Sequence, residues 1–356
     1  MSGLPGAPGA VSHGAAPCLV TGATGFIGGR LVERLLAAGW RVRCLVRPAS
    51  DTAHLRRLGA ELVVGDLAGE RSPTSALRGC GAVVHCAALV SDWATVGELR
   101  AVNVHGTRRL LEAAAWAGVR RVVHVSTTDV YGHPGTREVG EDHAASRFGS
   151  WYAQTKREAE VEARTVSAQR GLGVAIVRPA TVYGPGSRDV IAEIAAAIAR
   201  GQMLLVDGGA ADAGLVYVDN LADLVLLALS HPAAPGGAFN ASDALGVSWR
   251  RFADDLAAGL GAPPPRLSIP YGAARGLGLA LECSYRAARR ATGLTLPPLL
   301  SRQAVDVLGR PQSFDTRAAR ERLGWAPQVG YEEGLAATLV WLREEGVSPL
   351  WGPSRG

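Results

Sequence analysis

Short apolar runs alternate with segments of helical periodicity over the first half of the chain. The apolar runs fall at residues 18–21, 41–46, 61–64, 82–86, 121–126 and 173–178. Between them, residues 28–38, 96–117 and 152–169 place apolar side chains three or four positions apart, as in helices that cover a sheet. This alternation predicts an α/β fold with a doubly wound parallel sheet, and the nearly continuous apolar runs predict strands buried on both faces.

The alternation becomes looser after about Ala180. Turn signals at residues 183–186, 207–209 and 263–265 separate helices from short strands there, which favours a smaller α+β lobe. The expected parts of the chain are a disordered extension at 1–16, a sheet domain at 17–180, a C-terminal substrate lobe at 181–346 that returns some elements to the sheet, and a tail at 347–356.

Composition and charge patterning exclude several kinds of partner. Hydrophobic residues make up 47% of the chain, and apolar stretches such as residues 224–229 are far shorter than the ~20 residues that cross a bilayer. The formal net charge of +5 comes from basic residues scattered along the chain, without the runs of like charge typical of nucleic-acid-binding segments. We expect a cytoplasmic protein that neither inserts stably into a membrane nor binds nucleic acid.

Cysteines and histidines give no sign of a disulfide framework or a metal site. The five cysteines form no C-x-x-C pair, and four of them lie in or beside apolar runs. The eight histidines lack the spacing of metal ligands. We expect reduced thiols in the core and no bound metal.

A glycine-rich turn joins the first apolar run to the first predicted helix. Residues 21–28 have the sequence TGATGFIG, and glycines at this spacing permit a tight turn, a close approach to a pyrophosphate and close packing of helix on strand. The strand–glycine–helix order predicts a dinucleotide site of the Rossmann type. The residues of this turn expected to contact the cofactor are Gly22, Thr24, Gly25, Phe26, Ile27 and Gly28.

The residue after the second apolar run bears on the choice between NADP and NAD. Sites that prefer NAD place a carboxylate there, which accepts hydrogen bonds from the ribose hydroxyls. This chain has Arg47 after Val46, and a guanidinium suits the 2′-phosphate of NADP. The alternative is one more surface arginine in an arginine-rich chain, but the missing carboxylate favours NADP over NAD.

Two further strand ends are expected to border the same cofactor. Asp66 can offer a carboxylate to the adenine amino group, and Leu67 an apolar side chain to the face of the ring. Ala87 and Ala88 are small enough for the backbone to pass close to the ribose and the phosphates. Either pair is also compatible with a plain strand terminus.

Tyr152 and Lys156 lie four residues apart on a predicted helix, which places the phenol and the ammonium on one face. A phenol has an ordinary pKa near ~10, and a nearby cation is expected to lower it, so that Tyr152 exchanges a proton with a carbonyl oxygen while a hydride moves. Lys156 can also hydrogen-bond the nicotinamide ribose. It is the only lysine among 37 basic residues, which argues against a chance pair.

Hydroxyl and amide groups upstream complete the candidate catalytic set. Ser126 and Thr127 stand where the fifth apolar run ends, and the Thr127 hydroxyl can donate to the same substrate oxygen. Asn103 lies on the preceding predicted helix, where its amide can brace the backbone of the active site.

Taken together, these motifs resemble the extended short-chain dehydrogenase/reductase superfamily over roughly residues 18–342. The resemblance implies a catalytic set of Thr127, Tyr152 and Lys156, with Asn103 in support, and a homodimer formed through helices of the sheet domain. It also implies cofactor contacts beyond the glycine turn and the strand ends above. These contacts come from Ser126, Tyr152, Lys156, Pro179, Thr181 and Val182.

Two branches of the superfamily compete for the second half of the chain. Residues 130–132 and 183–186 resemble sugar-nucleotide epimerases and dehydratases, but Ala213 and Gly214 stand where such enzymes tend to carry an arginine for the diphosphate. Residues 301–335 are more similar to the 3β-hydroxysteroid dehydrogenase-like group, which includes 2-alkyl-3-keto acid reductases. The apolar stretch 271–300 is compatible with a hydrophobic substrate tunnel, a membrane-surface contact or an ordinary lobe helix.

The leading prediction is an oxidoreductase that uses NADP, or else NAD, to interconvert a ketone and a secondary alcohol. Its small-molecule substrate would be apolar and steroid-, keto-acid- or polyketide-like. One alternative is a sugar-nucleotide epimerase that recycles tightly bound NAD. Another is a non-catalytic dinucleotide sensor, which the presence of both Tyr152 and Lys156 disfavours.

Overall fold

The computed structural model describes residues 16–69, 73–136, 138–144, 149–292 and 300–346. The expected tail at 347–356 and all but the last residue of the expected N-terminal extension lie outside these described residues.

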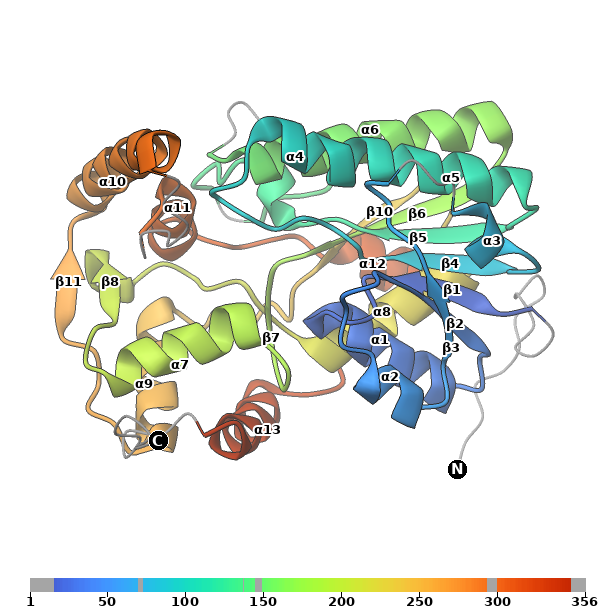
Figure 1. Cartoon of the computed structure of the whole chain (residues 1–356). Coiled ribbons are helices and arrows are strands. Elements are labelled where there is room, and N and C mark those ends of the chain that lie inside the picture. The colour runs from blue at the N-terminus through green and yellow to red at the C-terminus, as the bar shows by residue number, and fades with distance from the viewer. Residues whose placement is uncertain (1–15, 70–72, 137, 145–148, 293–299, 347–356) are drawn as a thin grey trace.

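A seven-stranded sheet forms the centre of the sheet domain, which is the right-hand part of Figure 1, and its strand order is β10-β6-β5-β4-β1-β2-β3. All of its strand pairs are parallel. The chain builds β1 to β3 outward and then crosses back to β4 beside β1, so a crevice lies at the carboxyl ends of these two strands. The predicted α/β fold with a doubly wound parallel sheet is confirmed. The strands are β1 (Cys18–Thr21), β2 (Val42–Val46), β3 (Glu61–Val64), β4 (Ala82–His85), β5 (Arg121–Val125), β6 (Gly173–Pro179) and β10 (Ala238–Ala241).

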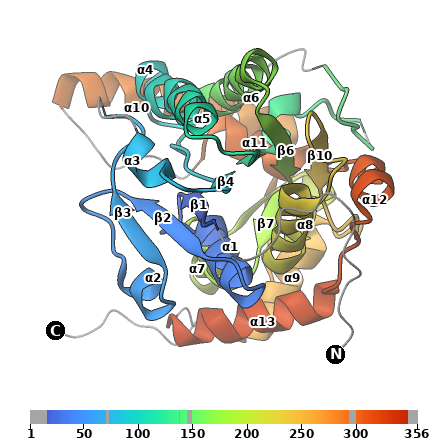
Figure 2. The same cartoon turned by 90° about the vertical axis from the view of Figure 1, so that its right-hand side faces the viewer.

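Helices cover both faces of this sheet, as Figure 2 shows from the side. One layer packs on Leu19, Val83 and Val122. It contains α3 (Thr74–Leu77), α4 (Val96–Arg100), the π-helix η1 (Ala101–Gly106), α5 (Thr107–Trp116) and α6 (Trp151–Arg170). The opposite layer packs on Val20 and Val84. It contains α1 (Phe26–Ala37), α2 (Ala53–Arg57), α8 (Val218–Ser230) and α12 (Arg317–Leu323).

Strand β3 departs from the prediction that every strand is buried on both faces. It is an edge strand of the sheet, and its first and last residues, Glu61 and Val64, are exposed. An apolar run of four residues does not distinguish a central strand from an edge strand, because both pair through the backbone.

The C-terminal lobe has a hydrophobic core of its own, centred on Tyr183, Trp249 and Phe252. Its strands form two small parallel sheets, β7 (Thr181–Tyr183) with β9 (Leu215–Tyr217) and β8 (Leu204–Val206) with β11 (Leu267–Ile269). Strand β10 and helices α8 and α12 return to the large sheet. The other helical elements after β5 are η2 (Thr128–Tyr131), η3 (Arg188–Ala192), α7 (Glu193–Ala199), η4 (Asp207–Gly209), α9 (Trp249–Leu260), α10 (Tyr271–Thr292), α11 (Arg302–Gly309) and α13 (Tyr331–Glu344).

Helix α6, which carries Tyr152 and Lys156, has clear sequence signals at both ends. The Ser150 hydroxyl caps its start by accepting a hydrogen bond from the backbone N–H of Ala153 at 3.2 Å. Gly171 ends it in the left-handed conformation, with φ 65°. Its buried residues recur every three or four positions, and this fixes which face meets the sheet.

Candidate active site

The glycine turn between β1 and α1 is shaped by two close backbone contacts. Gly22 has φ 71°, and a Cβ there would lie 2.7 Å from the backbone nitrogen of Ala87. A Cβ on Gly28 would overlap the carbonyl oxygen of Gly22, so both glycines are required for packing. Gly25 differs, because a Cβ there would touch only the Gly22 oxygen, at an ordinary 3.4 Å.

Packing within the protein therefore does not require a glycine at position 25. A ligand that approaches the backbone closely at this position would require one. Thr24 and Gly25 are exposed, α1 starts without a side-chain cap, and its first turn holds no acidic residue. The first N–H groups of α1 are thus available to an anion. The residues of this turn fit the pyrophosphate of a dinucleotide.

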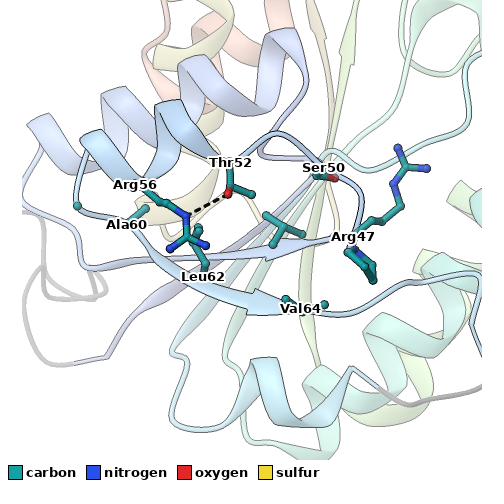
Figure 3. Close-up of a pocket in the computed structure, with 10 residues that line it drawn as sticks. Arg47, Ser50, Thr52, Arg56, Ala60, Leu62 and Val64 are labelled. Atoms are coloured by element: carbon teal, nitrogen blue, oxygen red, sulfur yellow. Dashed lines mark hydrogen bonds between the residues drawn. The ribbon is translucent and has the colours of Figure 1, made fainter.

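Arg47 stands at the carboxyl end of β2, with its side chain exposed. Figure 3 shows the hollow between β2, α2 and β3, where Arg56 donates to Thr52 at 3.2 Å while Arg47 extends away from both. Among the residues that the structure describes, the Arg47 guanidinium has no hydrogen-bond or ion-pair partner. It is therefore free to meet a phosphate.

The segments that follow β3 and β4 differ in exposure and in their distance from the glycine turn. Asp66 is exposed, and its carboxylate accepts a hydrogen bond from the backbone of Ala68 at 2.9 Å. Leu67 packs into the core with only 6% of its surface exposed, so little of its side chain could face an adenine ring as expected. Ala87 and Ala88 are both half-buried, and the backbone of Ala87 lies against Gly22, where a close approach needs small residues.

Lys156 is buried, and its Nζ donates a hydrogen bond to the carbonyl oxygen of Val125 at 2.8 Å. Burial lowers its pKa to about 8, while the nearby carboxylate of Glu160 acts in the opposite direction. Glu160 lies one turn further along α6 and pairs with the buried Arg178 at 2.6 and 2.9 Å. Arg178 also donates to the Tyr131 hydroxyl at 2.8 Å, so the lysine sits beside a fixed polar network.

Tyr152 is half-buried on the first turn of α6. Its pKa is raised above the ordinary value, first by burial and then by the carboxylates of Asp129 and Asp92. The expectation that Lys156 lowers this pKa is wrong for the structure as it stands, because desolvation and two nearby acids dominate. A raised pKa keeps the phenol protonated at neutral pH, which is the form that can give a proton to a carbonyl oxygen.

The other three predicted residues of the catalytic region, Thr127, Ser126 and Asn103, differ in their contacts. The Thr127 hydroxyl caps η2 by accepting from the backbone N–H of Asp129 at 3.2 Å, and Ser126 is buried at the end of β5. The Asn103 amide exchanges hydrogen bonds with both backbone groups of Leu89, at 2.8 and 3.1 Å, and donates to the Thr155 hydroxyl at 3.2 Å. It ties the loop after β4 to α6, which is the bracing contact expected for it.

The remaining predicted contacts are divided between the sheet and the lobe. Pro179 is buried at the end of β6, whereas Thr181 and Val182 are half-buried on β7. The backbone N–H of Thr181 donates to the carbonyl oxygen of Gly214 at 2.9 Å, so this segment leads directly into the lobe.

Sequence reasoning missed a buried polar cluster beside Thr127. His133, which is only 8% exposed, lies with Nε2 at 3.4 Å from Asp129 Oδ1. The Gln312 amide nitrogen donates to the carbonyl of Arg310 and lies 3.0 Å from His133 Nδ1, and the Gln303 amide nitrogen lies 3.1 Å from Nε2. The imidazole therefore lies between the Asp129 carboxylate and two glutamines of the C-terminal part of the chain.

A second carboxylate approaches Tyr152 from the loop after β4. The Ser301 hydroxyl donates to Asp92 at 2.5 Å, and burial raises the pKa of that carboxyl. The only sequence signal was the position of Asp92 and Asp129 just after β4 and β5, at the edge where the crevice opens.

The other side-chain chemistry of the chain lies outside this site. The cysteines are free thiols, with Cys18, Cys44 and Cys80 buried, Cys86 half-buried and Cys283 exposed. In the described ranges, no group of three or more His, Cys, Asp or Glu side chains is arranged to hold a metal ion. Within the same part of the chain, every helix is too short or too polar to cross a membrane.

Comparison with known proteins relates the sequence and the fold to nucleotide-dependent enzymes. A model of the NAD dependent epimerase/dehydratase family matches residues 18–242. The chain is 33% identical over 325 residues to the 4-hydroxy-2-methyl-3-oxo-4-farnesyl-3,4-dihydroquinoline-1-oxide ketoreductase of Stigmatella aurantiaca, a match covering 89% of this chain and 94% of that protein.

A UDP-glucose epimerase and a protein solved in complex with UDP-glucose are also similar to this chain. The UDP-glucose 4-epimerase of Mycolicibacterium smegmatis is 32% identical over 350 residues, which cover 92% of this chain and 98% of that one. The structure of MoeE5 in complex with UDP-glucose and NAD matches with a TM-score of 0.72 at 28% identity, over 92% of this chain and 99% of MoeE5. The relatives therefore include both reductases and epimerases.

Proposed function

Since the chain belongs to the NAD dependent epimerase/dehydratase family of extended short-chain dehydrogenases/reductases, and is therefore an NAD(P)-dependent enzyme, we propose that it interconverts a ketone and a secondary alcohol. The proposed substrate is an apolar small molecule of the steroid, keto-acid or polyketide type. The proposed cofactor is NADP in preference to NAD.

The proposed roles follow from the contacts of each side chain. When bound, the nicotinamide supplies the hydride for ketone reduction. Tyr152, protonated at neutral pH, gives its proton to the carbonyl oxygen, which the Thr127 hydroxyl helps to hold. Lys156 is fixed by Val125 and keeps its other N–H groups for the ribose.

The observation that carries the choice of reductase over epimerase is the packing at Ala213 and Gly214. Ala213 is fully buried, and a Cβ on Gly214, which has φ 59°, would overlap the backbone of Gln312. No long side chain fits at either position, so the diphosphate-binding arginine expected of a sugar-nucleotide enzyme has no place here. A dianionic diphosphate would lack this charge partner.

The carboxylates near Tyr152 narrow the substrate further. Asp92 and Asp129 are both close enough to raise the pKa of its phenol. A carboxylate carried by the substrate beside its reacting carbonyl would be repelled by the carboxylates of Asp92 and Asp129. Among the proposed substrate types, this favours a neutral ketone over a free keto acid.

The NADP preference is supported by Arg47. Arg47 follows β2, and the end of this strand lies next to the adenosine ribose of a dinucleotide in this fold. The neighbouring position holds Val46, so no carboxylate is present there to bind the ribose hydroxyls. A guanidinium donates hydrogen bonds to a 2′-phosphate and cannot accept them from a 2′-hydroxyl.

A sugar-nucleotide epimerase is the second candidate, and the similarity to the mycobacterial epimerase and to MoeE5 favours it. In that case NAD stays on the enzyme and is recycled. The protein would then be purified with NAD bound and would act on UDP-glucose without added cofactor.

One experiment separates the two candidates. The nucleotide released from purified protein by denaturation is identified, and NADPH and NADH oxidation are then followed with neutral steroid and polyketide ketones. We expect NADPH-dependent ketone reduction and no turnover of UDP-glucose. Bound NAD together with cofactor-free epimerisation of UDP-glucose would overturn the proposal.

We also propose a cytoplasmic homodimer formed through α5 and α6. Trp116 of α5 and Val161 of α6 are large apolar side chains with 81% and 55% of their surface exposed. Sedimentation of the wild type should give a dimer, and Val161→Glu should give a monomer; a wild-type monomer would contradict this assembly.

A further inference from the structure

A second groove, of about 560 Å³, lies between the sheet domain and α10. From the sheet domain it is lined by Arg47 after β2 and by Leu89 and Trp93 after β4. From the lobe it is lined by Tyr285 and Arg289 of α10. The proposed ligand of the 2′-phosphate thus shares a groove with a helix that lies far away in the sequence.

Helix α10 is held at this groove by contacts with the loop after β4. Arg289 Nη1 donates a hydrogen bond to the carbonyl oxygen of Trp93 at 2.7 Å. The rings of Trp93 and Tyr285 meet edge to face, with centroids 4.9 Å apart and an interplanar angle of 74°. Tyr285 is buried, so Arg289 is presented to the groove from an anchored turn of the helix.

The charge of the groove favours an anion. Among the described residues that line it, Arg47 and Arg289 are the cations and Glu98 is the only acid. The Glu98 carboxylate is engaged by Thr95, from the backbone N–H at 2.7 Å and from the hydroxyl at 2.8 Å. Arg289 donates to Trp93 through Nη1, and its charge also helps to lower the pKa of the Glu98 carboxyl; its remaining N–H groups are the ones that can bind a ligand.

We infer that Arg289 is a second ligand of the 2′-phosphate of NADP, facing Arg47 across the groove. This inference rests on the proposed NADP preference and extends it to the lobe. Two guanidiniums from different parts of the chain would share one dianionic group, and each adds charge-assisted hydrogen bonds that NAD cannot receive. The lobe therefore takes part in choosing the cofactor, and NADP joins α10 to the sheet domain.

The test measures equilibrium binding by isothermal titration calorimetry and needs no substrate. The ligands are NADP⁺ and NAD⁺, together with 2′,5′-ADP and 5′-AMP, which isolate the 2′-phosphate. We expect Arg289→Gln to weaken NADP⁺ and 2′,5′-ADP by about 10-fold, in line with hydrogen bonds to a charged group, and to leave NAD⁺ and 5′-AMP within about 2-fold. Arg286→Gln, at an exposed position outside the lining of the groove, is the matched control and should change neither pair.

Arg47→Gln separates the inference from the proposed function. If Arg47→Gln weakens 2′,5′-ADP but Arg289→Gln does not, the inference is wrong and the NADP preference stands. If Arg289→Gln weakens NAD⁺ as much as NADP⁺, the residue serves another part of the nucleotide and the inference also fails. A wild type that binds 2′,5′-ADP no better than 5′-AMP contradicts both. Should Arg289→Gln not fold, Arg289→Lys replaces it, with a smaller loss on the same two ligands expected.

Discussion

At the Lys156 end of the crevice the polar groups are buried and come mainly from the sheet domain, whereas at the Arg47 end the cations are exposed or half-buried and come from both parts of the chain. Lys156, Glu160 and Arg178 are each no more than 2% exposed and are linked to fixed partners. Arg47 is exposed and has no partner among the described residues, and Arg289 reaches the same groove from the lobe.

The difference separates the proposed chemistry from the proposed choice of cofactor. A buried, satisfied network has one geometry and tolerates little change. The exposed Arg47 side chain keeps its conformational freedom until a ligand orders it, and Arg289 is held by one hydrogen bond to Trp93. Reaction type is therefore tied to the core of the fold, and cofactor choice to a surface that substitutions can alter without unfolding it.

Removing the phenol tests the buried end most directly. We expect Tyr152→Phe to lower kcat for ketone reduction by about 10²–10⁴-fold, because the proton donor is lost, with little change in NADP⁺ binding. Steady-state kinetics and calorimetry measure the two effects. Trp151→Phe, at the exposed neighbouring position, should leave both unchanged. Equal losses in the two variants would show that α6 had been disturbed instead.

Breaking the buried ion pair tests whether that end is held by core packing. Arg178→Met leaves Glu160 buried without its partner, and we expect the free energy of unfolding to fall by about 3–5 kcal/mol. The matched control is Arg100→Met. It breaks the more exposed ion pair between Arg100 of α4 and Glu158, which lies on α6 like Glu160, and it should change stability little. Chemical denaturation of both variants gives the comparison, and similar losses would contradict it.

The cost of burying Lys156 should appear as a pH dependence of stability. Burial lowers its pKa from 10.5 to about 8, so above pH 8 the unfolded chain binds more protons than the folded one and stability rises with pH towards 10.5. We expect the stability of Lys156→Met relative to wild type to be greatest near neutral pH and to shrink by on the order of 2 kcal/mol by about pH 10.

Denaturation curves at several pH values measure this slope. Arg157→Met, on the next residue of α6 and partly exposed, is the control and should show no such trend. A pH-independent difference for Lys156→Met would mean that the ammonium is not desolvated in solution.

The smallest effect is expected from the acid beside Tyr152. Asp129 raises the pKa of the phenol, so Asp129→Asn should lower it and move the alkaline fall of kcat/KM for reduction to lower pH. The exposed Asp142 is a control for charge removal, and Asp142→Asn should leave the profile in place. An unchanged profile in Asp129→Asn would place that carboxylate too far away to act.

Much of the sheet and the best-defined part of the site could be predicted from local patterns. The runs at residues 18–21 and 61–64 became β1 and β3, and the glycine turn and the Tyr152–Lys156 spacing occur within single elements. Such features depend on backbone conformation and on periods of two and 3.6 residues, which are local properties of the sequence. Edge placement of β3 and the π-helical turn at Asn103 are not local in this sense, and the sequence did not predict them.

The sequence by itself determined the strand–helix order, the glycine turn, the lysine beside the tyrosine and the arginine after β2. Only the tertiary structure decided that Asp129 and Asp92 approach Tyr152, that Gly214 has no room for a side chain, and that Arg289 shares a groove with Arg47. The physical reason is sequence separation: Arg47 and Arg289 meet through the docking of α10 on the loop after β4. Contacts of that range depend on how whole elements pack, which no local period records.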